Sequence, residues 1–246
     1  MTPDGFYDCP LLLKQLLRNA LLQWPDQEIV YRDRRRMTYA GLGVRTDRLA
    51  SALHMEMGVR PGDTVAVLDW DSHRFLEALF AVPMMGAVLQ TVNVRLSAEQ
   101  VAYTIGHTGA SELLVNEDFA ELVDAVRPLL PAVRRVVIMH DRSGDASVAS
   151  GAARCDAEYE ALLDAGQDGY DFPDFDENTQ AIAFYTSGAT GLPKCVGFTH
   201  RGIVLHTLAP LARLGLAPRQ GRFDRSSVYT AHSACPRPGR CSAWRN

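Results

Sequence analysis

One loop of this sequence combines residue types that could bind phosphate groups. It contains two glycines, small hydroxyl residues and a lysine, and it lies between two short apolar stretches. Because they lack a Cβ atom, Gly188 and Gly191 can adopt positive φ angles and let backbone N–H groups converge on an anion. Ser187 and Thr190 add hydroxyl donors, and Lys194 adds a positive charge. At about 4 Å and an effective dielectric of about 20, one lysine and one phosphate charge attract by roughly 4 kcal/mol before desolvation.

The residue types of this loop are also compatible with a simple turn and invite comparison with a P-loop. Gly, Ser and Thr are ordinary residues of any hairpin turn, so the loop could be a turn without a ligand. It is also not the P-loop of nucleotide triphosphatases, because the Gly-x-x-x-x-Gly-Lys-Ser/Thr spacing is missing. Lys194 is followed by Cys195 and an apolar stretch that reads as a strand, where a P-loop would open a helix. An unrelated P-loop nucleotidase is therefore the weaker alternative.

The elements that must position the loop alternate between two patterns. Compact apolar runs, typical of buried strands, alternate with stretches whose apolar residues recur at helical spacing. This alternation predicts an α/β fold with a largely parallel sheet and helices on both faces. A hairpin is expected near the N-terminus, from 28–32 and 37–39. The predicted strands are 64–68, 87–92, 112–116, 135–139, 180–186 and 195–199, and the predicted helices are 10–23, 40–57, 71–85, 97–109, 119–130, 156–165 and 201–214.

Several helix ends carry recognisable signals. Ser97 and Gln100 have the spacing of a capping box, in which two side chains satisfy backbone N–H groups at the helix start. Asp71 or Ser72 can cap the preceding helix. Gly58 closes an earlier helix as a C-terminal cap would. These signals support the helical segments independently of their apolar periodicity.

Other candidate catalytic groups have simpler explanations. His200 and His206 are candidates for a catalytic base, but a histidine at a helix start usually makes a capping or interhelical hydrogen bond. Asp174 and Asp176, in an acidic connector at 166–178, could be read as an acid/base pair or a metal site, although charged residues in connectors are usually solvated. No Ser or Cys nucleophile has a visible His/Asp partner order, and a Gly-x-Ser-x-Gly elbow is missing. Hydrolase chemistry is therefore not indicated.

Composition excludes several classes of protein. The 246 residues are 47% hydrophobic and 22% charged with a formal net charge of −4, which is ordinary for a soluble globular protein and unsuited to nucleic acid. Five scattered cysteines without a Cys-x-x-Cys pair predict neither a zinc site nor a disulfide framework, and they favour the cytoplasm. The first residues lack the basic region of a secretion signal. The longest uncharged apolar run, 78–89, is too short for a transmembrane segment.

The ten residues from Tyr185 to Lys194 resemble the phosphate-binding motif of the AMP-forming acyl-CoA synthetases, the adenylate-forming ligase superfamily. That motif is usually written Tyr-Thr-Ser/Thr-Gly-Thr-Thr-Gly-Leu/Arg-Pro-Lys-Gly-Val. The resemblance covers about residues 10–229 and looks like the front half of fatty-acyl-CoA synthetases, with the medium- to long-chain branch favoured. It is carried outside the loop by 60–67, 75–78, 81–89, the Asn93-x-Arg95-Leu96-Ser97 segment and Tyr103.

The resemblance implies a two-step ligase with ATP, Mg²⁺, coenzyme A and a fatty acid as its small-molecule partners. A fatty acid would first become an acyl-adenylate and then an acyl-CoA. The Thr186 hydroxyl would also help to hold Mg²⁺. By this resemblance the β- and γ-phosphates are held by Thr186, Ser187, Gly188, Ala189, Thr190, Gly191 and Lys194.

Two departures lie inside or beside the motif. Ala189 stands where the family usually has threonine, and losing a hydroxyl bonded to a charged group costs about 1.5–3 kcal/mol. Cys195 replaces the usual glycine, so a side chain occupies a place where close backbone approach is wanted. We expect the change at Ala189 to weaken ATP binding without abolishing it, whereas the effect of Cys195 ranges from small to severe.

The end of the sequence departs from the family altogether. Residues 230–246 have no periodicity and are rich in Arg, Pro and Cys, so we hypothesise a frameshift or a truncated gene model and expect disorder. His232, Cys235 and Cys241 lack the fourth ligand and the spacing of a zinc site. Residues 1–229 would then be the front part of an adenylation domain, with the C-terminal domain absent and no catalytic residue retained.

Incompleteness of the domain has two expected consequences. The alternative to a ligase is a catalytically inactive fragment that at most binds nucleotide or a partner. Apolar surface that the missing half would cover also predicts self-association, for example as a homodimer.

Overall fold

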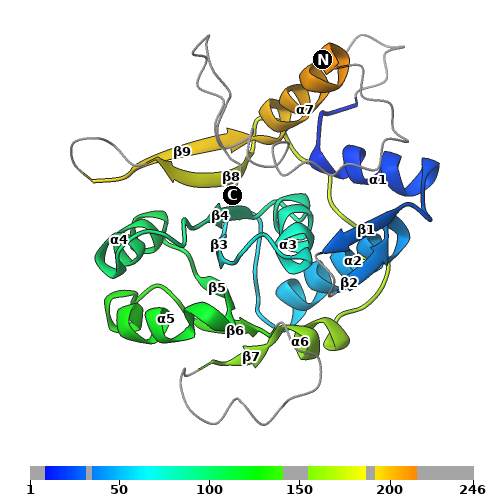
Figure 1. Cartoon of the computed structure of the whole chain (residues 1–246). Coiled ribbons are helices and arrows are strands. Elements are labelled where there is room, and N and C mark those ends of the chain that lie inside the picture. Colours follow the sequence, from blue (N-terminus) through cyan, green and yellow to red (C-terminus); the bar gives the residue numbers. More distant parts are fainter. Residues whose placement is uncertain (1–8, 32–34, 141–154, 187–191, 215–246) are drawn as a thin grey trace.

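The structure is a computed structural model that describes residues 9–31, 35–140, 155–186 and 192–214. Seven strands form one sheet in the order β7-β6-β5-β3-β4-β8-β9, and a separate hairpin is formed by β1 and β2 (Figure 1). The tail at 230–246 and its expected disorder lie outside the described residues. In the described part, no helix combines the length and the apolar character needed to cross a bilayer.

The bounds of the elements are as follows. The strands are β1 Glu28–Tyr31, β2 Arg35–Thr38, β3 Thr64–Leu68, β4 Val88–Thr91, β5 Glu112–Asn116, β6 Arg135–Met139, β7 Ala157–Glu158, β8 Gln180–Thr186 and β9 Lys194–Thr199. The α-helices are α1 Leu13–Gln23, α2 Tyr39–Met55, α3 His73–Met84, α4 Ala98–Thr108, α5 Ala120–Val126, α6 Tyr159–Ala165 and α7 His200–Leu214.

The sheet is parallel except for its last strand, which confirms the predicted fold class. β3 pairs in parallel with β4 on one side and β5 on the other, and only the β8–β9 pair in this sheet is antiparallel. Along β3 the side chains alternate between two cores, as the pleat of a strand requires. Val65 and Val67 join the core under α2, α3 and α6, whereas Ala66 and Leu68 join the core under α4 and α5. Figure 1 shows these two sets of helices on opposite sides of the sheet.

A third apolar cluster attaches the N-terminal helix and α7 to this body. Leu13 and Leu17 of α1 pack with Leu76 and Met84 of α3 and with Ile203 of α7.

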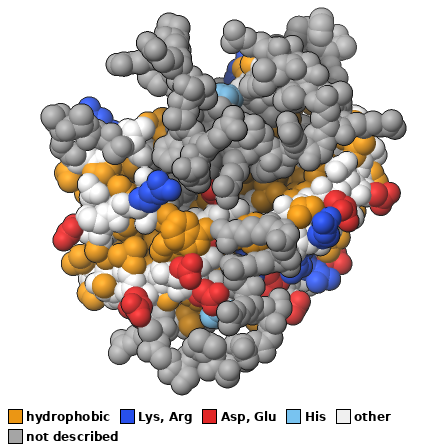
Figure 2. All heavy atoms as spheres, viewed as in Figure 1, with side chains coloured by type: hydrophobic (Ala, Val, Ile, Leu, Met, Phe, Trp, Pro, Cys, Tyr) orange, Lys and Arg blue, Asp and Glu red, His pale blue; other side chains and the backbone are white. Residues whose placement is uncertain are grey.

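On the face drawn in Figure 2, hydrophobic side chains gather at the surface on the side of α4 and α5, with acidic groups between them.

Two predicted helices are shorter than their sequence patterns indicated. The segment predicted as a helix over 119–130 contains the α-helix α5 between two short 3₁₀ turns, the second of which contains Pro128. Pro128 has no N–H to donate, so a continuous α-helix would lack one hydrogen bond at this point, although α3 accommodates Pro83 near its end. The segment predicted as a helix over 156–165 begins instead with β7, because the Asp156 N–H donates to the Val136 carbonyl and the chain pairs with β6. Only α6 follows as a helix.

The predicted caps are confirmed where they can be seen. The Ser72 hydroxyl accepts hydrogen bonds from the Arg74 and Phe75 N–H groups at the start of α3. At the start of α4, Ser97 and Gln100 form the complete capping box. Gly58, just beyond α2, has a φ angle of 68°, in the left-handed region that favours glycine.

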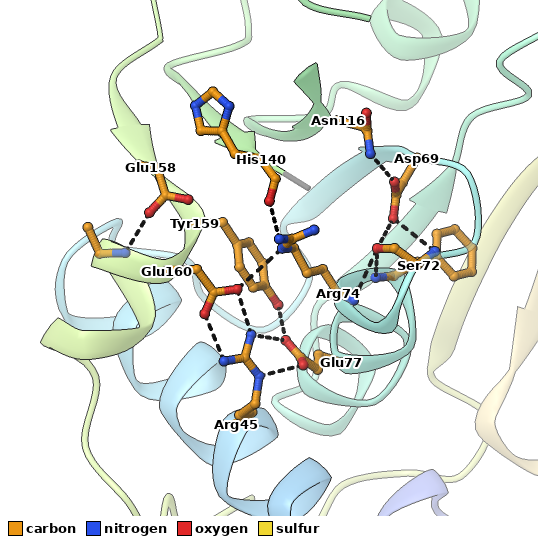
Figure 3. Close-up of polar contacts among 12 residues, drawn as sticks. Arg45, Asp69, Ser72, Arg74, Glu77, Asn116, His140, Glu158, Tyr159 and Glu160 are labelled. Atoms are coloured by element: carbon orange, nitrogen blue, oxygen red, sulfur yellow. Dashed lines mark hydrogen bonds and ion pairs between the residues drawn. The ribbon is translucent and has the colours of Figure 1, made fainter. Parts of the chain in front are cut away.

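A buried charge cluster joins α2, α3 and α6 (Figure 3). The Arg45 Nε lies 2.6 Å from Glu77 Oε1, and Arg45 Nη1 lies 2.8 Å from Glu160 Oε2. The Tyr159 hydroxyl donates to Glu77 Oε2 at 2.7 Å. Because the Glu77 side chain is fully buried, its charge depends on these partners.

A histidine fixes the start of α7 against α1. His200 is fully buried, and its Nδ1 accepts a hydrogen bond from the Leu13 N–H at 3.2 Å. The Phe175 ring packs edge-on against the imidazole with a centroid separation of 4.9 Å. Burial lowers the pKa of His200 to about 4. The residue is therefore part of the packing between helices, as its position at a helix start predicted, and it is not placed as a catalytic base.

We expect Arg45→Ala to lower the free energy of unfolding by about 3–5 kcal/mol, because it leaves the buried Glu77 carboxylate without its main partner. The measurement is urea unfolding followed by circular dichroism. Arg48→Ala is the matched control, since Arg48 lies on the same helix but pairs with Asp168 at the surface. Equal destabilisation by the two substitutions would contradict this role.

His200 should make the free energy of unfolding depend on pH. Its pKa in the folded protein lies below the ordinary value of 6.5, so the unfolded chain binds a proton that the folded protein excludes. Stability from this residue is complete above pH 6.5 and is lost as the pH falls toward 4. We expect His200→Asn to flatten the curve of unfolding free energy against pH over this window, by up to about 1.4 kcal/mol per pH unit. Urea unfolding at pH 7.5, 6.5 and 5.5 measures the slope, and parallel curves for the two proteins would refute the assignment.

Candidate functional site

The candidate phosphate loop is the turn of the β8–β9 hairpin. The antiparallel pairing runs from Gln180 opposite Thr199 to Thr186 opposite Lys194. Thr186 and Lys194 are therefore the last strand pair before the turn, and both are exposed. A hydroxyl and an ammonium group thus belong to facing residues at the mouth of the hairpin.

The structure brings together two of the seven predicted site residues, Thr186 and Lys194. The others lie outside the described residues, and their predicted roles stay predictions. They are Ser187, Gly188, Ala189, Thr190 and Gly191.

Side-chain packing explains why the hairpin forms in this register. Most of β8 is buried, and its Phe184 ring stacks on Phe198 of β9 with centroids 5.5 Å apart and planes 13° apart. Gly197 leaves room for the Gln180 side chain, whose amide nitrogen would lie 2.9 Å from a Cβ atom at that position. A one-residue slip would move these contacts to the opposite face of the strand pair.

β8 ends, at Thr186, on the carboxyl side of the parallel strands. β8 pairs in parallel with β4, with Leu89 opposite Ile182 and Thr91 opposite Phe184. The turn therefore follows the last residue of β8 on the side of the sheet where strands β3 to β6 also end. In open α/β sheets, ligands bind outside the carboxyl ends of the strands. The position of Thr186 and Lys194 in the fold thus agrees with their predicted role.

Helix α4 contributes contacts that the sequence did not indicate. His107 Nδ1 lies 2.6 Å from the hydroxyl of Tyr185, the residue before Thr186. The Tyr103 ring, one turn earlier in α4, lies edge-on to Tyr185. Burial, followed by the neighbouring Cys195 thiol, raises the pKa of Tyr185 well above its ordinary value, so the phenol keeps its proton. The four-residue spacing of Tyr103 and His107 places them on one helix face, but that spacing does not reveal their partner.

A second polar cluster at the carboxyl ends of β3 and β5 is closed on itself (Figure 3). Asn116 Nδ2 donates to Asp69 Oδ1 at 2.8 Å, and the Ser72 N–H donates to Asp69 Oδ2 at 3.1 Å. All three side chains are buried. Because their polar atoms bond one another and the start of α3, they shape the turn after β3 and leave little capacity for a ligand.

The carboxylates of the connector do not form a catalytic pair. Asp174 is paired with Lys14 at 2.8 Å, while Asp176 accepts a hydrogen bond from the Asn178 N–H at 2.8 Å within its own turn. Among the described residues, no group of three or more His, Cys, Asp or Glu side chains could hold a metal ion.

A surface depression of about 490 Å³ lies at the other end of the sheet from the hairpin. Its lining comes from the end of α2, the start of β6, β7 and α6, and includes Arg134, Arg135 and Asp156. Since β7 and β9 are at opposite ends of the seven-stranded sheet, this depression does not contribute to the phosphate site.

Comparison with known proteins agrees with these features. The family described as AMP-binding enzyme matches residues 17–232. The medium-chain-fatty-acid–CoA ligase of Ectopseudomonas oleovorans is 38% identical over 165 residues, which are 67% of this chain and 30% of the relative. The long-chain-fatty-acid–CoA ligase of Thermus thermophilus is 37% identical over 211 residues, covering 84% of this chain and 37% of the relative. The chain thus spans about a third of the length of these relatives.

Solved structures share the fold. The anthranilate CoA ligase AuaEII in complex with anthranoyl-AMP superposes with a TM-score of 0.72 at 22% identity, over 84% of this chain and 38% of the other. MbtA of Mycobacterium smegmatis superposes with a TM-score of 0.71 at 26% identity, over 84% and 37%. Taken with the fold and the hairpin, the family match over residues 17–232 shows that the chain belongs to the AMP-binding enzyme family.

Proposed function

We propose that this chain carries the polyphosphate-binding part of an ATP-dependent fatty-acyl-CoA ligase. The observation that supports this most is the facing pair of Thr186 and Lys194 at the mouth of a hairpin on the carboxyl side of the sheet. Residues 1–229 would form the front part of the adenylation domain. The β- and γ-phosphates of ATP would be held by Thr186, Ser187, Gly188, Ala189, Thr190, Gly191 and Lys194.

The proposed reaction has two steps. A carboxylate oxygen of the fatty acid attacks the α-phosphorus of ATP, and the bond to the β-phosphate oxygen breaks to release pyrophosphate. The thiol sulfur of coenzyme A then attacks the acyl carbonyl carbon, and AMP leaves. Negative charge grows on the leaving pyrophosphate, so fixed donors and the Lys194 ammonium group lower the barrier by stabilising that charge.

In this proposal the Thr186 hydroxyl would also help to bind Mg²⁺. Magnesium bound to nucleotides takes most of its ligands from phosphate oxygens and water, with few protein groups. An exposed hydroxyl at the end of β8 could be one such ligand, and the metal would arrive with the phosphates. Bound Mg²⁺ would supply further neutralisation of phosphate charge.

The substrate class and location are narrower proposals. Relatives named for medium-chain and long-chain fatty acids support a fatty acid as the carboxylate. A relative from Humulus lupulus named for acetate is 33% identical, so the test of this proposal compares carboxylic acids of different length. The scattered cysteines support a cytoplasmic location. Neither the structure nor these relatives support the expected homodimer.

Two alternatives can be distinguished from this proposal, one by the structure and one by an activity assay. A P-loop nucleotidase needs a helix directly after its lysine, whereas Lys194 opens strand β9, so that reading is wrong. The second alternative is a chain that binds nucleotide or a partner but catalyses nothing. This second alternative differs from the proposed ligase only in that it forms no acyl-adenylate and no acyl-CoA.

We expect Lys194→Ala to weaken the binding of ATP and inorganic tripolyphosphate by about 10- to 150-fold, because a charge-assisted contact is lost. Isothermal titration calorimetry measures both ligands. Lys14→Ala is a matched control, because Lys14 and Lys194 are the two lysines of the sequence and Lys14 pairs with Asp174 in the connector. Equal affinities for the wild type and Lys194→Ala would overturn the proposed site.

ATP–pyrophosphate exchange driven by fatty acids of different length tests the ligase itself. Exchange that depends on the fatty acid and disappears in Lys194→Ala supports adenylation. Nucleotide binding without exchange at high protein concentration supports the inactive alternative.

Restoring the family's threonine should strengthen the site. We expect Ala189→Thr to increase ATP affinity by about tenfold or more, because it returns a hydroxyl donor to a charged ligand. The same calorimetric titration measures the gain. Ala189→Val, which has a similar shape without the hydroxyl, should show none, and an equal gain in both variants would contradict a hydrogen-bonding role.

A further inference from the structure

The hairpin leaves the support of the parallel sheet just before the candidate loop. The pairing between β4 and β8 ends with Thr91 opposite Phe184. Beyond that point, Tyr185 and Thr186 are paired with Cys195 and Lys194 of β9. Since β9 is the outermost of the described strands, this end of the hairpin depends on contacts from elsewhere for its direction.

Helix α4 supplies such a contact from 78 residues away in sequence. The hydroxyl of Tyr185 and Nδ1 of His107 are 2.6 Å apart, and the two rings meet edge-on with centroids 5.9 Å apart. The Tyr103 ring packs against both, with centroids 5.6 Å from His107 and 6.4 Å from Tyr185. Because the phenol keeps its proton, it can donate to an unprotonated Nδ1. This directional bond fixes the residue that precedes Thr186.

We propose that His107 is a positioning residue for the proposed phosphate site, acting through the Tyr185 hydroxyl on the end of β8 that carries Thr186. The inference rests on the proposed function. A small change in the direction of β8 at Tyr185 moves the Thr186 hydroxyl, and an oriented donor loses much of its effect when it is displaced. His107 itself does not touch the phosphates in this proposal.

The competing explanation is that His107 only helps α4 to pack on the sheet. In that case its removal would lower stability and leave the affinity of the folded protein for a polyphosphate unchanged. Ligand affinity measured well below the unfolding temperature therefore separates the two roles.

The first test compares His107→Ala with His107→Asn in the full 246-residue chain. Calorimetric titration with inorganic tripolyphosphate, and with ATP, should show about 3- to 10-fold weaker binding for His107→Ala, in line with the loss of one hydrogen bond. Asparagine places an amide close to the position of Nδ1, so His107→Asn should restore affinity to within about twofold of the wild type. Failure of His107→Ala to weaken binding would refute the inference.

The chain offers a matched control for this test. His54 of α2 makes the same kind of contact with Tyr170, with Nδ1 and the hydroxyl 3.0 Å apart and ring centroids 5.9 Å apart. This pair joins α2 to the connector before β8 and does not involve the hairpin turn. His54→Ala should leave both affinities unchanged, and a loss equal to that of His107→Ala would overturn the inference.

A double-mutant cycle assigns the effect to the Tyr185 contact. Tyr185→Phe should weaken tripolyphosphate binding about as much as His107→Ala, and the double variant should be little weaker than either alone. Additive losses would contradict action through the hydroxyl. If Lys194→Ala weakens binding while the His107 variants do not, the proposed function stands and this inference fails. If the wild type binds neither tripolyphosphate nor ATP, the proposed function fails and takes the inference with it.

Discussion

The architecture depends on burying the parallel strands on both faces. β3 is hydrogen-bonded on both edges, and its alternate side chains enter two separate apolar cores. Such a strand exists only if helices cover both sides, because parallel strands tolerate little exposure to water. The crossover helices α3 and α4 meet this need, and they also set which strand ends come together at the carboxyl edge of the sheet. The position of the candidate phosphate loop follows from this constraint.

Local sequence patterns predict much of this architecture. The strands at 64–68, 112–116, 135–139 and 180–186 have the bounds expected from their apolar runs, since a strand buried on both faces leaves a continuous apolar stretch. The helix caps at Ser72 and Ser97 were also predictable from the sequence, because a capping side chain bonds backbone N–H groups only two or three residues away. Information of this kind is contained within a few consecutive residues.

The features that the sequence did not predict depend mainly on contacts between residues far apart in the chain. β7 exists because two residues pair with β6, and nothing in its own pattern distinguishes it from the first turn of a helix. Pro128 lies within the predicted helix at 119–130, but a proline alone does not predict a break in this chain, because α3 contains Pro83. At the candidate site, the loop motif was visible as a run of ten residues, whereas the bond from His107 to Tyr185 joins positions that no local rule connects.

The position of β9 in the sheet affects how firmly Lys194, its first residue, is held. Among the strands that the structure describes, β9 is outermost, and it runs antiparallel to its neighbour. The backbone of an outermost strand offers a row of donors and acceptors to another extended segment. Pairing of a further extended segment with β9 would restrict the motion of this strand, which begins at Lys194. In the proposed function, occupancy of that outer edge would then change the affinity for a triphosphate.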